Sequence, residues 1–209
     1  MDRIDRLSVH RSLVCVHFAS AFGKGDACGR MLAAMSAVGT ANADGVSFPA
    51  VIDEVSATWT PTPWKPVEAE YTDGMYVGRY SLDLDSGRTA RSPHRPLLHG
   101  STLYQVSEYH ALITLLFAVY NQHDEALAKA AEMPFAEVRR RFLLATLRVQ
   151  LMKPVFDNEV TVRTAIEKVT DKWERHRMLF IDLTSDIADG SHRCALSVCV
   201  NARDDLIGT

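Results

Sequence analysis

Apolar and polar residues alternate with a period of two along much of the chain, which predicts β-strands. The C-terminal third contains most of these segments, and Asp189-Gly190 is a hairpin signal between two of them. The predicted strands are Val51–Trp59, Met75–Leu84, Leu143–Met152, Val160–Ile166, Met178–Leu183 and Cys194–Val200. The pattern therefore predicts a sheet that ends in a meander of long antiparallel strands.

One long segment has helical periodicity instead. Apolar residues recur at helical spacing over Ser101–Asn121, and from Ala111 onward they occupy nearly the whole circumference. A helix that is apolar all round is expected to be central and buried. A second short helix is predicted over Glu125–Met133, and Ala136–Arg141 allows a further turn or two.

Two parts of the N-terminal third are less regular. Three closely spaced prolines interrupt the chain at Pro61, Pro63 and Pro66. Because proline has no backbone N–H, this stretch is predicted to be a loop or an edge of the sheet. Residues 1–50 show no clear pattern and are treated as an N-terminal extension of uncertain structure. Residues 51–209 are predicted to form one domain.

Strands followed by one long buried helix and then further antiparallel strands indicate an α+β fold. A sheet wrapped around a single central helix satisfies this order, and that arrangement is the hot-dog fold. The predicted fold class is therefore α+β, a hot-dog domain with an antiparallel sheet around one long central helix.

Composition excludes several other classes. The chain has 209 residues and a formal net charge of −3, which gives no electrostatic case for binding nucleic acid or an anionic membrane. No apolar run approaches the roughly 18–20 residues that span a bilayer. The four cysteines form no C-x-x-C pair, which argues against a metal site and is typical of free thiols in the cytoplasm. No metal or cofactor is expected.

The segment that leads into the long helix carries a family resemblance. Residues 91–105 contain a proline, an Arg-Pro pair and a glycine before the helix, and they resemble the β-hydroxyacyl thioester dehydratases. Leu98-His99-Gly100 is similar to the His-Gly step of the MaoC-type hydratases. Arg91 stands at the dehydratase histidine position and Gln105 at that of its helix carboxylate. Neither side chain exchanges protons near pH 7.

From Met75 to the end, the chain also resembles the FcoT-like long-chain acyl-CoA thioesterases, which are hot-dog proteins. In that family the helix carries an amide and, three residues later, a glutamate, matched here by Gln105 and Glu108. Lys153-Pro154 matches the Lys-Pro of a later strand. The resemblance implies a thioester substrate on coenzyme A or an acyl carrier protein.

These residues suit acyl thioester chemistry. Gln105 and Glu108 share a helix face, so they can act on the same substrate. Gln105 is expected to donate to the thioester carbonyl oxygen or to hold a water, and Glu108 is expected to act as a general base. His99 is a second candidate base. The expected substrate-binding residues are Ser101, Tyr104, Arg91, His94 and Lys153. Alternatively, Ser101 is the helix N-cap, Gln105 bonds to backbone, and Glu108 pairs with a cation at a subunit interface.

The predicted function is therefore hydrolysis of fatty acyl thioesters in lipid or secondary metabolism. Two alternatives stay open: a dehydratase or hydratase of β-hydroxyacyl thioesters, and a non-catalytic acyl-binding protein. The resemblance also implies at least a homodimer, because the family pairs its sheets across a two-fold axis.

Overall fold

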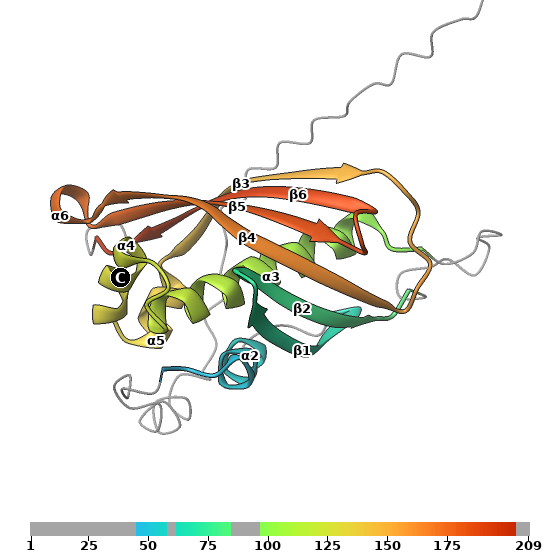
Figure 1. Ribbon diagram of the computed structural model, residues 1–209, viewed down its shortest axis with the longest axis horizontal. Coiled ribbons are helices and arrows are strands. Elements are labelled where there is room, and N and C mark those ends of the chain that lie inside the picture. Colours follow the sequence, from blue (N-terminus) through green and yellow to red (C-terminus); the bar gives the residue numbers. More distant parts are fainter. Residues whose placement is uncertain (1–44, 58–61, 85–96, 204–209) are drawn as a thin grey trace, which may run out of the picture.

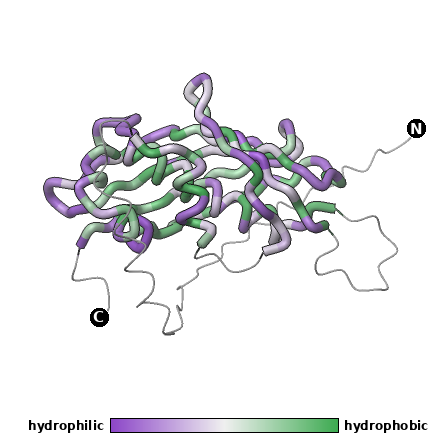
Figure 2. Tube along the Cα trace, turned by 90° about the horizontal axis from the view of Figure 1, so that it is seen from below, coloured by the Kyte–Doolittle hydropathy of each residue, from purple (hydrophilic) through white to green (hydrophobic). Residues whose placement is uncertain are grey.

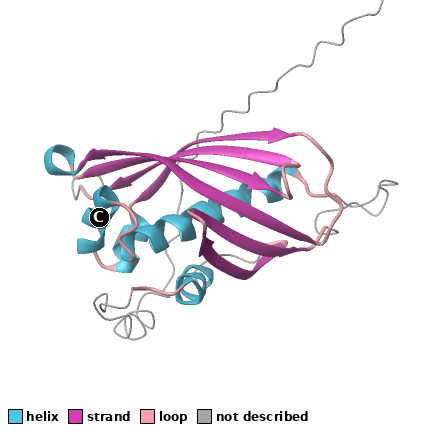
Figure 3. Cartoon of the chain, viewed as in Figure 1, coloured by secondary structure: helices cyan, strands magenta, loops and turns pink. Residues whose placement is uncertain are grey.

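A computed structural model describes residues 45–57, 62–84 and 97–203 of the chain (Figure 1). These residues form one six-stranded antiparallel sheet with helices on one side of it (Figure 3). The strand order across the sheet is β1-β2-β4-β5-β6-β3. The strands are β1 (Trp64–Thr72), β2 (Met75–Leu82), β3 (Phe142–Leu151), β4 (Glu159–Lys172), β5 (Met178–Ile187) and β6 (His192–Asn201). The α+β class predicted from the sequence is confirmed.

The helices are of very different lengths. They are α2 (Phe48–Ser56), α3 (Gly100–Tyr120), α4 (Glu125–Ala128), α5 (Phe135–Arg140) and α6 (Trp173–His176), with a 3₁₀ turn at Lys129–Glu132. The 21-residue helix α3 runs across one face of the sheet, and the short helices α4 and α5 lie near its C-terminal end (Figure 1). Hydrophobic stretches follow the inner parts of the elements, whereas several connecting turns are hydrophilic (Figure 2).

Helix α3 and the sheet bury each other. Fourteen residues of α3 are buried, and they lie on nearly all sides of it. On β5 every second side chain is buried, among them Leu179, Ile181 and Leu183, and these form part of the same hydrophobic core. Each such side chain contributes about 1.5–3 kcal/mol when it leaves water. The helix predicted over Ser101–Asn121 is thus present, shifted by one residue.

A close contact fixes how deeply α3 lies against β2. The buried His110 places Nδ1 2.7 Å from the Tyr80 hydroxyl and Nε2 3.1 Å from the Tyr76 carbonyl oxygen. The carbonyl can only accept, so Nε2 carries the proton and Nδ1 accepts from Tyr80. Burial lowers the pKa of His110 to about 4, which keeps the ring neutral at pH 7. The imidazole fits because the facing residue is Gly78.

One predicted element is wrong. Val51–Trp59 was expected to be a strand, but Phe48–Ser56 is helix α2. Ser47 caps this helix by accepting from the Ala50 N–H, and a proline occupies the first turn. The buried residues Phe48, Val51 and Val55 recur at helical spacing, and Phe48 stacks on Phe117 of α3 with ring centroids 3.8 Å apart. Packing against α3 therefore decides in favour of a helix.

Of the proline-rich stretch, Pro61 lies outside the described residues, Pro63 comes just before β1, and Pro66 lies in this edge strand, one of the two outcomes predicted for it. β1 pairs only with β2, and the register shifts between Pro66 and Glu68. A missing N–H is tolerated at an edge strand or a bulge. The remaining predicted strands are present and mostly longer than predicted. The short helix expected over Glu125–Met133 is divided into α4 and the 3₁₀ turn.

The contact between α3 and β2 gives a stability prediction. A Cβ at Gly78 would lie 2.6 Å from two atoms of the His110 ring, which is held by hydrogen bonds at both nitrogens. Gly78→Ala is therefore expected to lower the free energy of unfolding by about 1–3 kcal/mol. Urea denaturation followed by circular dichroism measures this change.

The matched control is Gly100→Ala, because a Cβ at that helical position meets nothing within 4 Å. Its free energy of unfolding should stay equal or rise by up to about 1 kcal/mol. Equal stability of Gly78→Ala and the wild-type protein would contradict the close approach of His110 to β2.

Candidate active site

The entry to α3 is held by backbone hydrogen bonds to a segment that follows β3. The Leu98 N–H donates to the Val155 carbonyl at 2.8 Å, and the Lys153 N–H donates to the Ser191 carbonyl at 3.1 Å. The predicted binding residue Lys153 lies two residues before Val155, and it is exposed. The helix entry at Leu98 therefore meets Val155, two residues after Lys153.

The N-terminus of α3 has no side-chain cap. His99 is the N-cap residue in extended conformation, and its side chain makes no capping hydrogen bond. The N–H of Leu103 donates to the His99 carbonyl at 2.9 Å, so the N–H groups before Leu103 have no acceptor within the helix. These donors and the positive end of the helix dipole favour a negative charge here. Ser101 is the second residue of the helix, so its alternative role as N-cap is wrong.

Four predicted residues share one face of α3. Ser101, Tyr104, Gln105 and Glu108 recur at i, i+3, i+4 and i+7, which is the spacing of one helix face. Ser101 is exposed and the other three are partly exposed, while almost all of the helix beyond them is buried. The structure therefore brings these residues together along an accessible stripe that starts at the helix N-terminus.

Glu108 is the charged group of this stripe. Burial raises the pKa of its carboxyl above the usual range, because the ionised form loses hydration. Among the described residues, it makes no ion pair and no hydrogen bond. Burial also raises the pKa of Tyr104, and the negative charge of Glu108 one turn away raises it further. A desolvated carboxylate without a partner is a typical candidate for a general base.

Gln105 contacts a residue that the sequence analysis did not single out. The indole N–H of Trp64, at the start of β1, donates to Oε1 of Gln105 at 3.4 Å. Trp64 lies in the proline-rich stretch, and no local pattern relates it to a helix residue 41 positions later. The contact depends on how β1 and α3 come together in the fold.

The remaining predicted site residues either lie outside the described part of the chain or are not seen to contact Gln105 or Glu108. Arg91 and His94 lie outside the described residues. The His99 side chain is exposed at the helix entry. No group of three or more His, Cys, Asp or Glu side chains within the described ranges could hold a metal ion. None of the helices in the part that the structure describes is long and apolar enough to cross a membrane.

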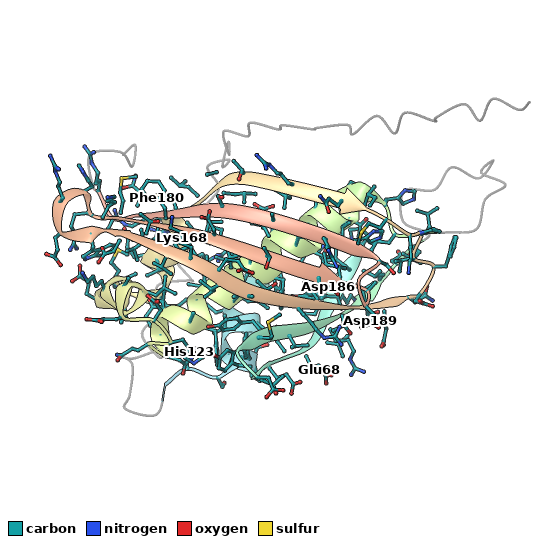
Figure 4. The ribbon with its side chains drawn as sticks, turned by 45° about the horizontal axis from the view of Figure 1, so that its top comes forward. Glu68, His123, Lys168, Phe180, Asp186 and Asp189 are labelled. Carbon is teal, nitrogen blue, oxygen red and sulfur yellow. The ribbon has the colours of Figure 1, made fainter. Side chains whose placement is uncertain are left out.

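Other ionisable side chains lie away from the stripe. His123 follows the C-terminal end of α3, and Asp186 and Asp189 belong to the end of β5 and its turn (Figure 4). Asp189 pairs with Arg163, and Asp186 accepts from the Gly190 N–H. These carboxylates have structural partners, in contrast to Glu108.

A buried histidine at the start of β6 was also missed. His192 is 3% exposed, and neither ring nitrogen has a hydrogen-bond partner among the described residues. It alternates with Cys194, whose Sγ lies 3.2 Å from Ser107 Oγ of α3, so its side chain is on the helix side of the sheet. Extending the predicted strand two residues toward the N-terminus would have found this position.

Comparisons with known proteins give structural neighbours only. No family model matches the chain, and no curated protein matches it. A candidate thioesterase from Shewanella oneidensis is 13% identical, with a TM-score of 0.49 over 72% of this chain and 97% of that one. A candidate thioesterase from Syntrophus aciditrophicus is 10% identical, with a TM-score of 0.47 over 66% and 84%. A thioesterase family protein from Silicibacter pomeroyi is 10% identical, with a TM-score of 0.45 over 75% and 100%.

The unpaired imidazole gives a second stability prediction. Burial lowers the pKa of His192, and a contact with the Ser191 backbone only partly offsets this, so the ring is neutral at pH 7; neither ring nitrogen makes a hydrogen bond of standard geometry to a described residue. His192→Leu removes both polar atoms at similar volume and should raise the free energy of unfolding by about 1–2 kcal/mol. Urea denaturation measures the change.

The exposed His176 provides the control, since His176→Leu should change stability by no more than about 0.5 kcal/mol. A loss of stability in His192→Leu would mean that the imidazole is hydrogen-bonded in solution.

Proposed function

We propose that this protein hydrolyses acyl thioesters carried by coenzyme A or an acyl carrier protein. The observation that carries the proposal is the partly buried, unpaired carboxylate of Glu108, two turns from the uncapped N-terminus of α3 and on the same face as Gln105. We further infer that the domain has the hot-dog arrangement, in which the sheet wraps the long helix. The fatty acyl chain remains the proposed substrate class.

The chemistry requires a base and donors for developing charge. Glu108 removes a proton from water, and the water oxygen attacks the thioester carbonyl carbon. Negative charge then develops on the carbonyl oxygen, where the uncapped N–H groups at the helix N-terminus and the Gln105 amide would donate. Collapse of the tetrahedral intermediate breaks the C–S bond, and the proton held by Glu108 passes to the leaving thiolate. The raised pKa of Glu108 makes it a stronger base than an exposed glutamate.

The other predicted residues are proposed to bind the carrier. Ser101 and Tyr104 flank Gln105 on the accessible face of α3. His99, exposed at the helix entry, is instead proposed as a second candidate base. Lys153 is exposed on the segment bonded to the helix entry, which suits a phosphate of coenzyme A or a phosphopantetheine arm. Arg91 and His94 remain proposed partners of the same phosphates.

A hydrolysis assay tests the role of Glu108. Free thiol release should be measured with short-, medium- and long-chain acyl-CoA and with acyl carrier protein substrates. Glu108→Gln removes the base but keeps the size, and it is expected to lower kcat about 10²- to 10⁴-fold. Glu70→Gln is the control, because Glu70 is exposed on β1, and it should retain full activity.

Three results would overturn this proposal: full activity of Glu108→Gln, no thiol release from any substrate by the wild-type protein, or turnover limited to hydration of crotonyl-CoA. The last result would indicate the lyase alternative, and binding of acyl-CoA without turnover would indicate a non-catalytic binder.

We also propose that the protein forms at least a homodimer. β3 is an edge strand of the described sheet, and an edge strand presents unpaired backbone donors and acceptors. Leu143 and Leu151 on this strand are 50% and 62% exposed. A ten-residue edge strand with exposed leucines is suited to pairing with a second copy.

Sedimentation velocity tests this assembly. The wild-type protein should sediment as a dimer or larger, and Leu151→Lys should shift it toward the monomer. Val67→Lys is the matched control on the opposite edge strand, where Val67 is 46% exposed, and it should leave the mass unchanged. A strictly monomeric wild-type protein would refute the dimer.

A further inference from the structure

Trp64 is buried beside the proposed site although it belongs to an edge strand. Its side chain is 3% exposed, and its indole N–H points to Oε1 of Gln105 at 3.4 Å. Gln105 is the polar residue between Ser101 and Glu108 on the accessible face of α3. A buried side chain of β1 therefore reaches the middle of that face.

Two tyrosines hold the indole in place. Its ring centroid lies 5.9 Å from that of Tyr80, at an interplanar angle of 79°, and 4.8 Å from that of Tyr109, at 63°. Both tyrosines are themselves fixed, because their hydroxyls lie 2.7 Å from His110 Nδ1 and from Ser56 Oγ, respectively. Edge-to-face rings and satisfied hydroxyls restrict rotation of Trp64.

The chemistry of the indole decides the orientation of the amide. An indole nitrogen only donates, so its partner must be the amide oxygen of Gln105 and not the amide nitrogen. With Oε1 facing Trp64, the NH₂ group of Gln105 faces away from the indole, and it donates to no described residue.

We propose that Trp64 is the positioning residue that orients the Gln105 amide, so that its NH₂ group donates to the thioester carbonyl or to the hydrolytic water. The inference rests on the proposed thioester hydrolysis and adds a residue from β1 to its machinery. A donor that is already oriented needs no reorganisation as charge develops, so its loss affects the transition state more than substrate binding.

Variants at the two positions separate the possible roles. Trp64→Phe keeps an aromatic ring but removes the N–H, and it should lower kcat about tenfold with KM changed less than twofold. Gln105→Glu keeps an acceptor for Trp64 but removes the NH₂ donor, and it should lower kcat about 10²-fold. Gln105→Leu should have a similar effect. Trp64→Phe should add nothing in the Gln105→Leu background, because both changes remove one interaction.

Trp173→Phe is the matched control, since Trp173 is also 3% exposed but lies in α6, far along the chain from the site residues. It should leave kcat unchanged. Additive effects of Trp64→Phe and Gln105→Leu, or an unchanged kcat in Trp64→Phe, would overturn the positioning role.

The Trp64 indole ¹H–¹⁵N resonance gives a readout that does not depend on catalysis. Its proton should shift upfield in Gln105→Leu, which removes the acceptor, and should not shift upfield in Gln105→Glu, which keeps an acceptor. An unmoved resonance in Gln105→Leu would overturn the inference even in an active enzyme. A shifted resonance in a protein that hydrolyses no thioester would support the oriented amide and refute the proposed function instead.

Discussion

The structure depends on the contact between the long helix and strand β2. His110 of α3 packs against β2 at Gly78. Its two ring nitrogens form hydrogen bonds with the Tyr80 hydroxyl and the Tyr76 carbonyl. A buried, neutral ring with two satisfied nitrogens and a close approach to Gly78 restricts the depth and rotation of α3 against the sheet. Tyr80 also packs edge-to-face on Trp64, so the same contact extends to the edge strand. The core and the proposed site therefore share one set of side chains.

The sequence predicts the strands and the long helix correctly because their burial follows a regular pattern of apolar residues. Alternation along β5 and the first halves of β4 and β6 reflects one face that is more buried than the other, and the all-round apolar segment after Ala111 reflects a buried helix. The error at α2 has a different origin. Val51 and Val55 fit both periods over so short a segment, and the preference for a helix comes from the Ser47 cap and from the packing of Phe48 on Phe117.

Of the candidate site, the sequence predicts only the part that lies on the single helix α3. The spacing of Gln105 and Glu108 already placed them on a shared face, and the structure has them there. The contacts of Trp64 and His192 depend instead on how distant strands meet α3, and no local spacing encodes that. His192 still left a signal, because it continues the inward alternation of Cys194 and Leu196.

The energetics of Glu108 distinguish it from the surface carboxylates. The pKa of Asp171 is lowered by its hydrogen bond to Lys129, so its ionised form is stabilised in the folded state. The pKa of Glu108 is raised by burial, so ionising it destabilises the fold: the cost grows as pH rises from the ordinary glutamate pKa to the raised one and is constant above that. A structural role for Glu108 would require a cation that offsets this cost, and none of the described residues supplies one. A reactive role needs the raised pKa itself, which is why the unpaired carboxylate favours catalysis over scaffolding.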